Sequence, residues 1–205
     1  QDGRLSEQIL TEFKGMNLSY APRIWSAHTA KKALEMIKER SYDLIIVMLR
    51  ISDMSPISFA QKIKEKYPRK PMILLAFDES EVKSISSKAD TFFDNIFIWT
   101  GNSHVFAAII KYVEDKKNVK KDIESGDIRV IMLIEDNIRY YSTLFPEIYR
   151  EVLYYTKELM NKSLNDSHRM IRMRARPKIL LAKNYEQAKK YFDRYHKNII
   201  GILSD

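Results

Sequence analysis

The 205-residue chain contains no cysteine and only five glycines. Without cysteine it has no disulfides, no thiolate metal sites and no Cys nucleophile, as is usual in a reducing compartment. No Gly-rich phosphate loop or Ser/His/Asp set is recognisable, and no apolar run reaches the length of a membrane span. The start of the chain has no signal-peptide pattern. We therefore expect a cytoplasmic protein that is not an enzyme. The four histidines are scattered without ligand spacing: His28, His104, His168 and His196.

The positive charge is concentrated in one segment. The net charge is +8, and residues 126–205 carry 15 basic and 10 acidic residues. Residues 157–178 alone hold 7 basic and 2 acidic residues, which accounts for the whole excess of that half. This segment raises the question of whether it binds an anion or a partner.

Short apolar runs alternate with amphipathic segments along the chain. The runs predict strands at residues 23–26, 44–48, 72–76, 92–99, 129–134, 179–182 and 199–203. The amphipathic segments predict helices at residues 5–16, 30–40, 59–67, 82–88, 103–125, 138–164 (kinked or broken at Pro146) and 185–195. This alternation is typical of βαβ units with parallel sheets. Gly126 ends a long charged helix, so we predict two domains, residues 1–125 and 126–205.

Residues 43–56, DLIIVMLRISDMSP, and the preceding helix TAKKALEMIKER resemble response-regulator receiver domains. The resemblance implies an α/β, flavodoxin-like, doubly wound parallel sheet. Receivers carry an acceptor Asp after the third strand, Ser or Thr after the fourth and Lys after the fifth. Met48, Ala76 and Trp99 stand at these positions here. Without the carboxylate, hydroxyl and ammonium there is no metal coordination or phosphoryl charge stabilisation. We expect the first domain to be a degenerate, phosphate-independent receiver with no cofactor.

The second domain retains the acidic residues of the family. In VIMLIEDN, Glu135 and Asp136 match the acidic pair after the first receiver strand, and Asp205 matches the phosphoacceptor. Three carboxylates at one sheet edge would suit oxygen-ligated Mg²⁺. Two simpler readings stay open: acids stabilising a helix N-terminus at Glu135 and Asp136, and a turn at Asp205.

Residues 1–125 open with a helix, whereas receivers begin with a central strand. We expect that strand either upstream of Gln1 or supplied by residues 129–134 in a permuted arrangement. Residues 126–205 correspond to the first part of a second receiver-like domain with a basic insertion at residues 157–178.

Two further blocks, EDNIRYYSTLFPEIYREVL and the terminal RPKILLAKNYEQAKKYFDRYHKNIIGILSD, resemble the amino-terminal regulatory segment of bacterial proteins with a phosphoenolpyruvate synthase-type region. This implies a regulatory module that controls an attached or partner phosphotransfer module. A histidine kinase would phosphorylate Asp205, and the first domain would serve docking or homodimerisation. No membrane partner is expected.

The basic segment allows three interpretations: a solvated face, a docking surface and a nucleic-acid site. Arginine matches phosphate oxygens well, but no helix-turn-helix or aromatic stacking pattern surrounds the segment. Nucleic acid is thus the least favoured partner. A flavodoxin-like small-molecule or nucleotide-binding enzyme is the other alternative, and it rests on the fold alone. The candidate anion or partner contacts are Arg169, Arg172, Arg174 and Arg176.

Overall fold

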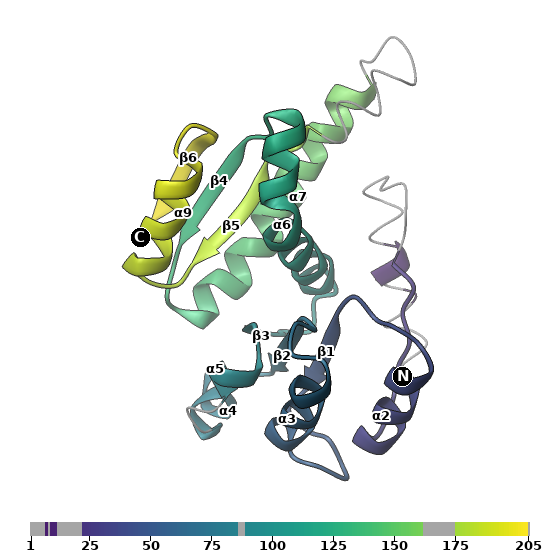
Figure 1. The fold of residues 1–205 in the computed structure, drawn as a ribbon. Coiled ribbons are helices and arrows are strands. Elements are labelled where there is room, and N and C mark those ends of the chain that lie inside the picture. Colours follow the sequence, from purple (N-terminus) through teal and green to yellow (C-terminus); the bar gives the residue numbers. More distant parts are fainter. Residues whose placement is uncertain (1–6, 8, 12–21, 86–88, 162–174, 205) are drawn as a thin grey trace. The chain divides into compact units, whose positions relative to one another are not determined.

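The computed structural model describes residues 7, 9–11, 22–85, 89–161 and 175–204 (Figure 1). Contacts between residues divide the chain into two compact units. One comprises Gln1–Ser6 and Pro22–Asn102, the other Glu7–Ala21 and Ser103–Asp205. The predicted α/β class with parallel sheets is confirmed. The predicted boundary at 125/126 differs from the division at 102/103, because the long helix before it packs within the second unit.

The first unit contains a sheet of three parallel strands in the order β1-β2-β3. Its strands are β1 (Ile45–Met48), β2 (Met72–Ala76) and β3 (Asn95–Ile98). All residues of the central strand β2 are at most 1% exposed. A strand covered on both faces favours a continuous apolar sequence, and MILLA is such a sequence. The predicted strand at residues 23–26 is wrong: this segment forms no strand, and Trp25 is exposed.

The helices described in the first unit are α2 (Ala30–Glu39), α3 (Pro56–Lys66), α4 (Glu79–Ser84) and α5 (Ala89–Phe92). The first three begin at polar caps. The side chains of Thr29, Ser55 and Asp78 accept N–H groups in the first turns of α2, α3 and α4. Such caps satisfy N–H groups that have no partner within the helix. They explain why these helices start where the sequence turns polar.

The second unit contains a sheet of three parallel strands with β4 (Val130–Ile134) in the centre. Its neighbours are β5 (Lys178–Ala182) and β6 (Ile199–Ser204). Since β4 pairs with strands on both sides within this sheet, it does not supply the first strand of the other sheet. The permuted arrangement is therefore wrong.

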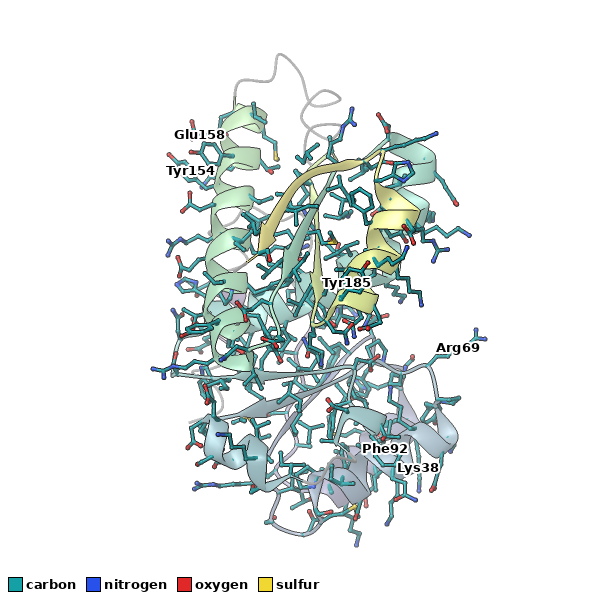
Figure 2. All side chains as sticks on the ribbon, turned by 90° about the vertical axis from the view of Figure 1, so that its left-hand side faces the viewer. Lys38, Arg69, Phe92, Tyr154, Glu158 and Tyr185 are labelled. Carbon is teal, nitrogen blue, oxygen red and sulfur yellow. The ribbon has the colours of Figure 1, made fainter. Side chains whose placement is uncertain are left out.

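The longest helices described in the second unit are α6 (His104–Gly126), α7 (Ile138–Asn161) and α9 (Tyr185–Tyr195). Helix α6 lies along β5, and α9 packs on β5 and β4 through Ala188 and Tyr195 (Figure 1). Helix α7 continues through Pro146 as one helix. It buries Phe145 and Tyr149, while Tyr154 projects outward and is 57% exposed (Figure 2). Within the described residues, no helix is both long and apolar enough to cross a membrane.

Candidate functional site

The acidic pair of the second sheet lies directly after its central strand β4. The backbone N–H of Glu135 donates to the carbonyl of Ala182 at 3.0 Å, which continues the pairing of β4 with β5. The Glu135 side chain is buried, and its Oε1 accepts the N–H of Asn137 at 2.9 Å. Asp136 is exposed. The edge therefore offers one buried and one exposed carboxylate, both of which are oxygen donors suited to Mg²⁺.

Strand β6 ends at the same edge as β4. The last pair of their register is Ile134 with Ser204, and Glu135 follows β4 directly. Asp205 itself lies outside the described residues. No group of three or more His, Cys, Asp or Glu side chains that could hold a metal is found in the described part of the chain. The three-carboxylate Mg²⁺ site thus stays a prediction.

The first sheet brings Met48, Ala76 and Trp99 to the ends of adjacent strands. Met48 is half-buried and ends β1, and Ala76 is fully buried and ends β2. Trp99 follows β3, its N–H donates to the carbonyl of Ala76 at 2.8 Å, and its indole Nε1 donates to the carbonyl of Asn102 at 3.0 Å. The ends of these strands thus carry a thioether, a methyl group and an indole, so a carboxylate, a hydroxyl and an ammonium are absent from these three positions.

Two aspartates near this edge cap helices. The Asp53 carboxylate accepts the N–H groups of Lys31 at 3.0 Å and Ala30 at 2.7 Å, and these bonds lower the pKa of Asp53. The Asp78 carboxylate accepts the Ser80 hydroxyl and a backbone N–H of α4, and the pKa of Asp78 is lowered by these bonds. Both carboxylates therefore act as helix caps, engaged with neighbouring donors.

A buried ionic cluster holds the second unit together around Asp115, in the middle of α6. This side chain is fully buried. Its carboxylate accepts two hydrogen bonds from Arg176, at 2.6 and 3.0 Å. It also accepts the Tyr149 hydroxyl at 2.7 Å and the backbone N–H of Ile179 at 3.0 Å. The Lys178 ammonium lies 3.5 Å away. The carboxylate therefore joins α6 to α7 and to β5.

The cluster fixes the charge state of its members. Burial alone would raise the pKa of Asp115, but the adjacent Arg176, together with Lys178, lowers it below its ordinary value. Burial raises the pKa of Tyr149 well above its ordinary value, and the neighbouring Asp115 charge adds to this. The cluster is thus built from an ionised carboxylate and a neutral tyrosine.

Arg176 was predicted as an anion or partner contact, and the structure places it differently. Its side chain is 6% exposed and forms a bidentate pair with Asp115. A guanidinium that is buried and already paired is not accessible to an anion from solution. The other candidates, Arg169, Arg172 and Arg174, lie outside the described residues.

Sequence reasoning missed the Asp115 cluster, although one signal was present. Asp115 lies three residues after Tyr112 and four before Val119, on the apolar stripe of α6. A carboxylate in the middle of such a stripe requires a buried partner. The pattern could have identified Asp115, but not Arg176, which is 61 residues away.

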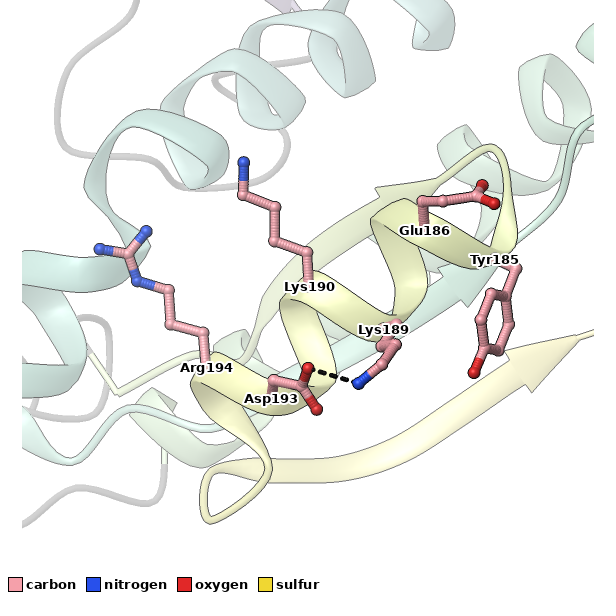
Figure 3. Close-up of a pocket in the computed structure, with 6 residues that line it drawn as sticks. All are labelled: Tyr185, Glu186, Lys189, Lys190, Asp193 and Arg194. Atoms are coloured by element: carbon pink, nitrogen blue, oxygen red, sulfur yellow. Dashed lines mark hydrogen bonds and ion pairs between the residues drawn. The ribbon is translucent and has the colours of Figure 1, made fainter.

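The surface of α9 carries a shallow recess of about 590 Å³ (Figure 3). Lys189 donates to Asp193 at 2.8 Å within it, and Tyr185 is 73% exposed. All of its lining comes from one helix and mixes both charges, so the recess has no buried polar anchor for a ligand. The lining residues are Tyr185, Glu186, Lys189, Lys190, Asp193 and Arg194.

Comparison with protein-family models gives no match, and no curated protein matches the chain. Residue chemistry and strand order are therefore the basis on which a function can be proposed for this chain.

Proposed function

We propose that the chain is a regulatory signalling module made of two receiver-like units. The first is phosphate-independent, and the second accepts a phosphoryl group on Asp205. The strand orders support this proposal. In a flavodoxin-like sheet of order 2-1-3-4-5, β5-β4-β6 correspond to positions two, one and three. The strands β1-β2-β3 correspond to positions three, four and five.

The observation that carries the proposal is the acidic pair at the carboxyl end of β4, beside the end of β6. Glu135 and Asp136 follow the central strand, and β6 ends beside it with the pair Ile134 and Ser204, which supports a role for the next residue, Asp205, at this edge. The carboxyl edge of an open parallel sheet is where such folds bind ligands. The arrangement is suited to a hard cation held by oxygen atoms.

The chemistry would be transfer of a phosphoryl group from a histidine kinase or another phosphodonor. A carboxylate oxygen of Asp205 forms the new P–O bond, while the bond between phosphorus and the donor breaks and its electron pair leaves with the donor. Glu135 and Asp136 would hold Mg²⁺, which neutralises charge on the phosphoryl oxygens. The acyl phosphate would then change how the unit engages its partner.

The first unit would act without phosphate chemistry, as a docking or dimerisation part. Met48, Ala76 and Trp99 together remove the carboxylate, the hydroxyl and the cation, so Met48→Asp alone would not restore a switch. The partner we propose is an attached or separate phosphotransfer module of the phosphoenolpyruvate synthase type.

Calorimetric titration with Mg²⁺, followed by beryllofluoride, tests the second unit. We expect the chain to bind Mg²⁺, and Asp136→Asn and Asp205→Asn to weaken this binding by at least about tenfold, the smallest effect of losing even an outer partner of a metal site. Beryllofluoride binding should depend on Asp205. Asp193→Asn is the matched control, because Asp193 is exposed on α9 and paired with Lys189. Absence of Mg²⁺ binding, or equal binding by all variants, would overturn the proposal.

The described residues favour neither alternative function. The enzyme alternative needs a ligand pocket, and the α9 recess has no buried polar anchor. The nucleic-acid alternative needs free basic side chains, and Arg176 is paired with Asp115.

A further inference from the structure

Four side chains connect the three loops at the carboxyl edge of the first sheet. Arg50 follows β1, Phe77 follows β2, Glu81 lies in α4, and Trp99 follows β3. We call these four residues the edge clamp. They all lie in the unit that contains Pro22–Asn102.

The Glu81 carboxylate is the centre of the edge clamp. Its Oε1 accepts a hydrogen bond from Arg50 Nη2 at 3.0 Å, and its Oε2 accepts the backbone N–H of Phe77 at 2.9 Å. The Glu81 side chain is 16% exposed, whereas that of Arg50 is 83% exposed. One anion therefore links the loop after β1 to the loop after β2 and to α4.

The aromatic side chains extend these contacts to the third loop. The Arg50 guanidinium lies 5.9 Å from the centre of the Phe77 ring, within the range of a cation–π contact. The Phe77 and Trp99 ring centres are 5.8 Å apart. Trp99 in turn bonds to the carbonyl of Asn102. The contacts thus run without interruption from the end of β1 to the loop after β3.

We propose that the edge clamp is a built-in substitute for a phosphoryl group. In a phosphorylated receiver, an added anion at this edge would accept bonds from a cation and a neighbouring donor. Here Glu81 supplies the anion permanently, Arg50 the cation and Phe77 the N–H donor. The clamp holds α4 and the three loops in a single arrangement, so the first unit does not switch. This inference depends on the proposed function, because that function identifies the edge as a former phosphoacceptor site.

Hydrogen exchange of α4 tests the clamp. Arg50→Met removes the ion pair and the cation–π contact but keeps an apolar stem. We expect exchange in the segment Glu79–Ser84 to accelerate about three- to tenfold, the effect of losing two exposed contacts of this kind. Lys32→Met is the matched control, because it removes the exposed Lys32–Glu35 pair of α2, which links no loops. Unchanged exchange in Arg50→Met, or equal acceleration in the control, would overturn the inference.

A coupling measurement makes the test sharper. Glu81→Met should also accelerate amide hydrogen exchange in α4. The double variant with Arg50→Met and Glu81→Met should exchange only slightly faster than either single variant, because both substitutions remove the same link. Full additivity would show that the two residues act separately and would overturn the clamp.

The same exchange measurement separates this inference from the proposed function. Addition of Mg²⁺ and beryllofluoride should leave exchange in Glu79–Ser84 unchanged, and a change there would overturn the phosphate-independent clamp. Arg50→Met should leave Mg²⁺ binding by the second unit unchanged. If Arg50→Met accelerates exchange in α4 but the native chain binds no Mg²⁺, the clamp is supported and the proposed function is overturned.

Discussion

Two arginine–carboxylate pairs connect elements in the two units, and they differ mainly in burial. In the second unit, Arg176 and Asp115 approach to 2.6 Å, with side chains 6% and 0% exposed. In the first unit, Arg50 and Glu81 approach to 3.0 Å, with side chains 83% and 16% exposed. The same pair of chemical groups therefore serves as part of a core in one unit and as a surface link in the other.

The difference shows what each pair can do. A buried pair costs much desolvation, so the loss of one partner leaves an uncompensated charge in the interior. An exposed pair is weakened by water and salt, so its loss changes the global stability little and affects only the local conformation. Asp115 and Arg176 can thus decide whether the second unit folds, whereas Arg50 and Glu81 can set only a local loop conformation.

The largest effect is expected from Asp115→Ala. It should destabilise the second unit by about 3–5 kcal/mol, because it leaves the Arg176 guanidinium buried without its partner. Urea unfolding should be followed by far-UV circular dichroism and by tryptophan fluorescence. Both tryptophans, Trp25 and Trp99, lie in the first unit, so the fluorescence transition should move little while part of the dichroism transition moves to lower urea.

A double substitution distinguishes lost attraction from stranded charge. Asp115→Leu with Arg176→Met should cost clearly less than the sum of the two single substitutions, because no lone charge remains buried. A loss below about 1 kcal/mol for Asp115→Ala would contradict the burial argument, since that is the range of exposed pairs.

Local sequence patterns predicted most of the elements. The strand at residues 72–76 and the helix at residues 185–195 have the predicted bounds. Continuous apolar runs and polar caps act over a few residues, so they can be read without a structure. The strand predicted at residues 23–26 was wrong because its apolar residues find no sheet to pair with in the described residues, where β1 pairs only with β2.

Long-range contacts could not be read from such patterns. Residues 157–178 appeared as one basic segment, yet Arg176 and Lys178 are buried beside acids of α6. These contacts also make α6 part of the second unit rather than a linker of the first. At the candidate site, the sequence placed Glu135 correctly after β4, but it did not reveal that this side chain is buried and bonded to Asn137.

The buried pair should also give the second unit an acid-sensitive stability. The pKa of Asp115 is lower in the folded protein than the value of about 3.9 expected in the unfolded chain. Its contribution is therefore present above that pH and is lost as the pH falls through the lowered pKa. The free energy of unfolding can be measured by urea unfolding between pH 6 and about 2, on both sides of the ordinary carboxyl pKa. It should fall less steeply with decreasing pH for Asp115→Asn than for the native protein. If the free energy of unfolding fell equally steeply with pH in both proteins, groups other than Asp115 would be responsible for the acid sensitivity.

A smaller effect is expected from Tyr149→Phe. This substitution removes one of the bonds to Asp115 and should cost about 1.5–3 kcal/mol, the value of a hydrogen bond to a charged group. The pKa of Tyr149 is raised in the folded protein, so its contribution is present below about pH 10 and is lost as the pH rises through the raised pKa. The variant should therefore lack this alkaline loss of stability. An ultraviolet titration of tyrosine ionisation should show that the late-ionising group of the native protein is absent from Tyr149→Phe. Tyr155→Phe is the control, because Tyr155 is 65% exposed.

The smallest effect is expected from Arg50→Met. Global stability of the first unit, followed by tryptophan fluorescence, should change by less than about 1 kcal/mol, because the Arg50 side chain is mostly exposed. Raising the salt concentration should reduce even this difference, whereas the effect of Asp115→Ala should persist because the buried pair is poorly screened. A loss for Arg50→Met as large as that for Asp115→Ala would show that exposure does not separate the two pairs. The edge clamp would then be part of the fold of the first unit rather than a local constraint on α4.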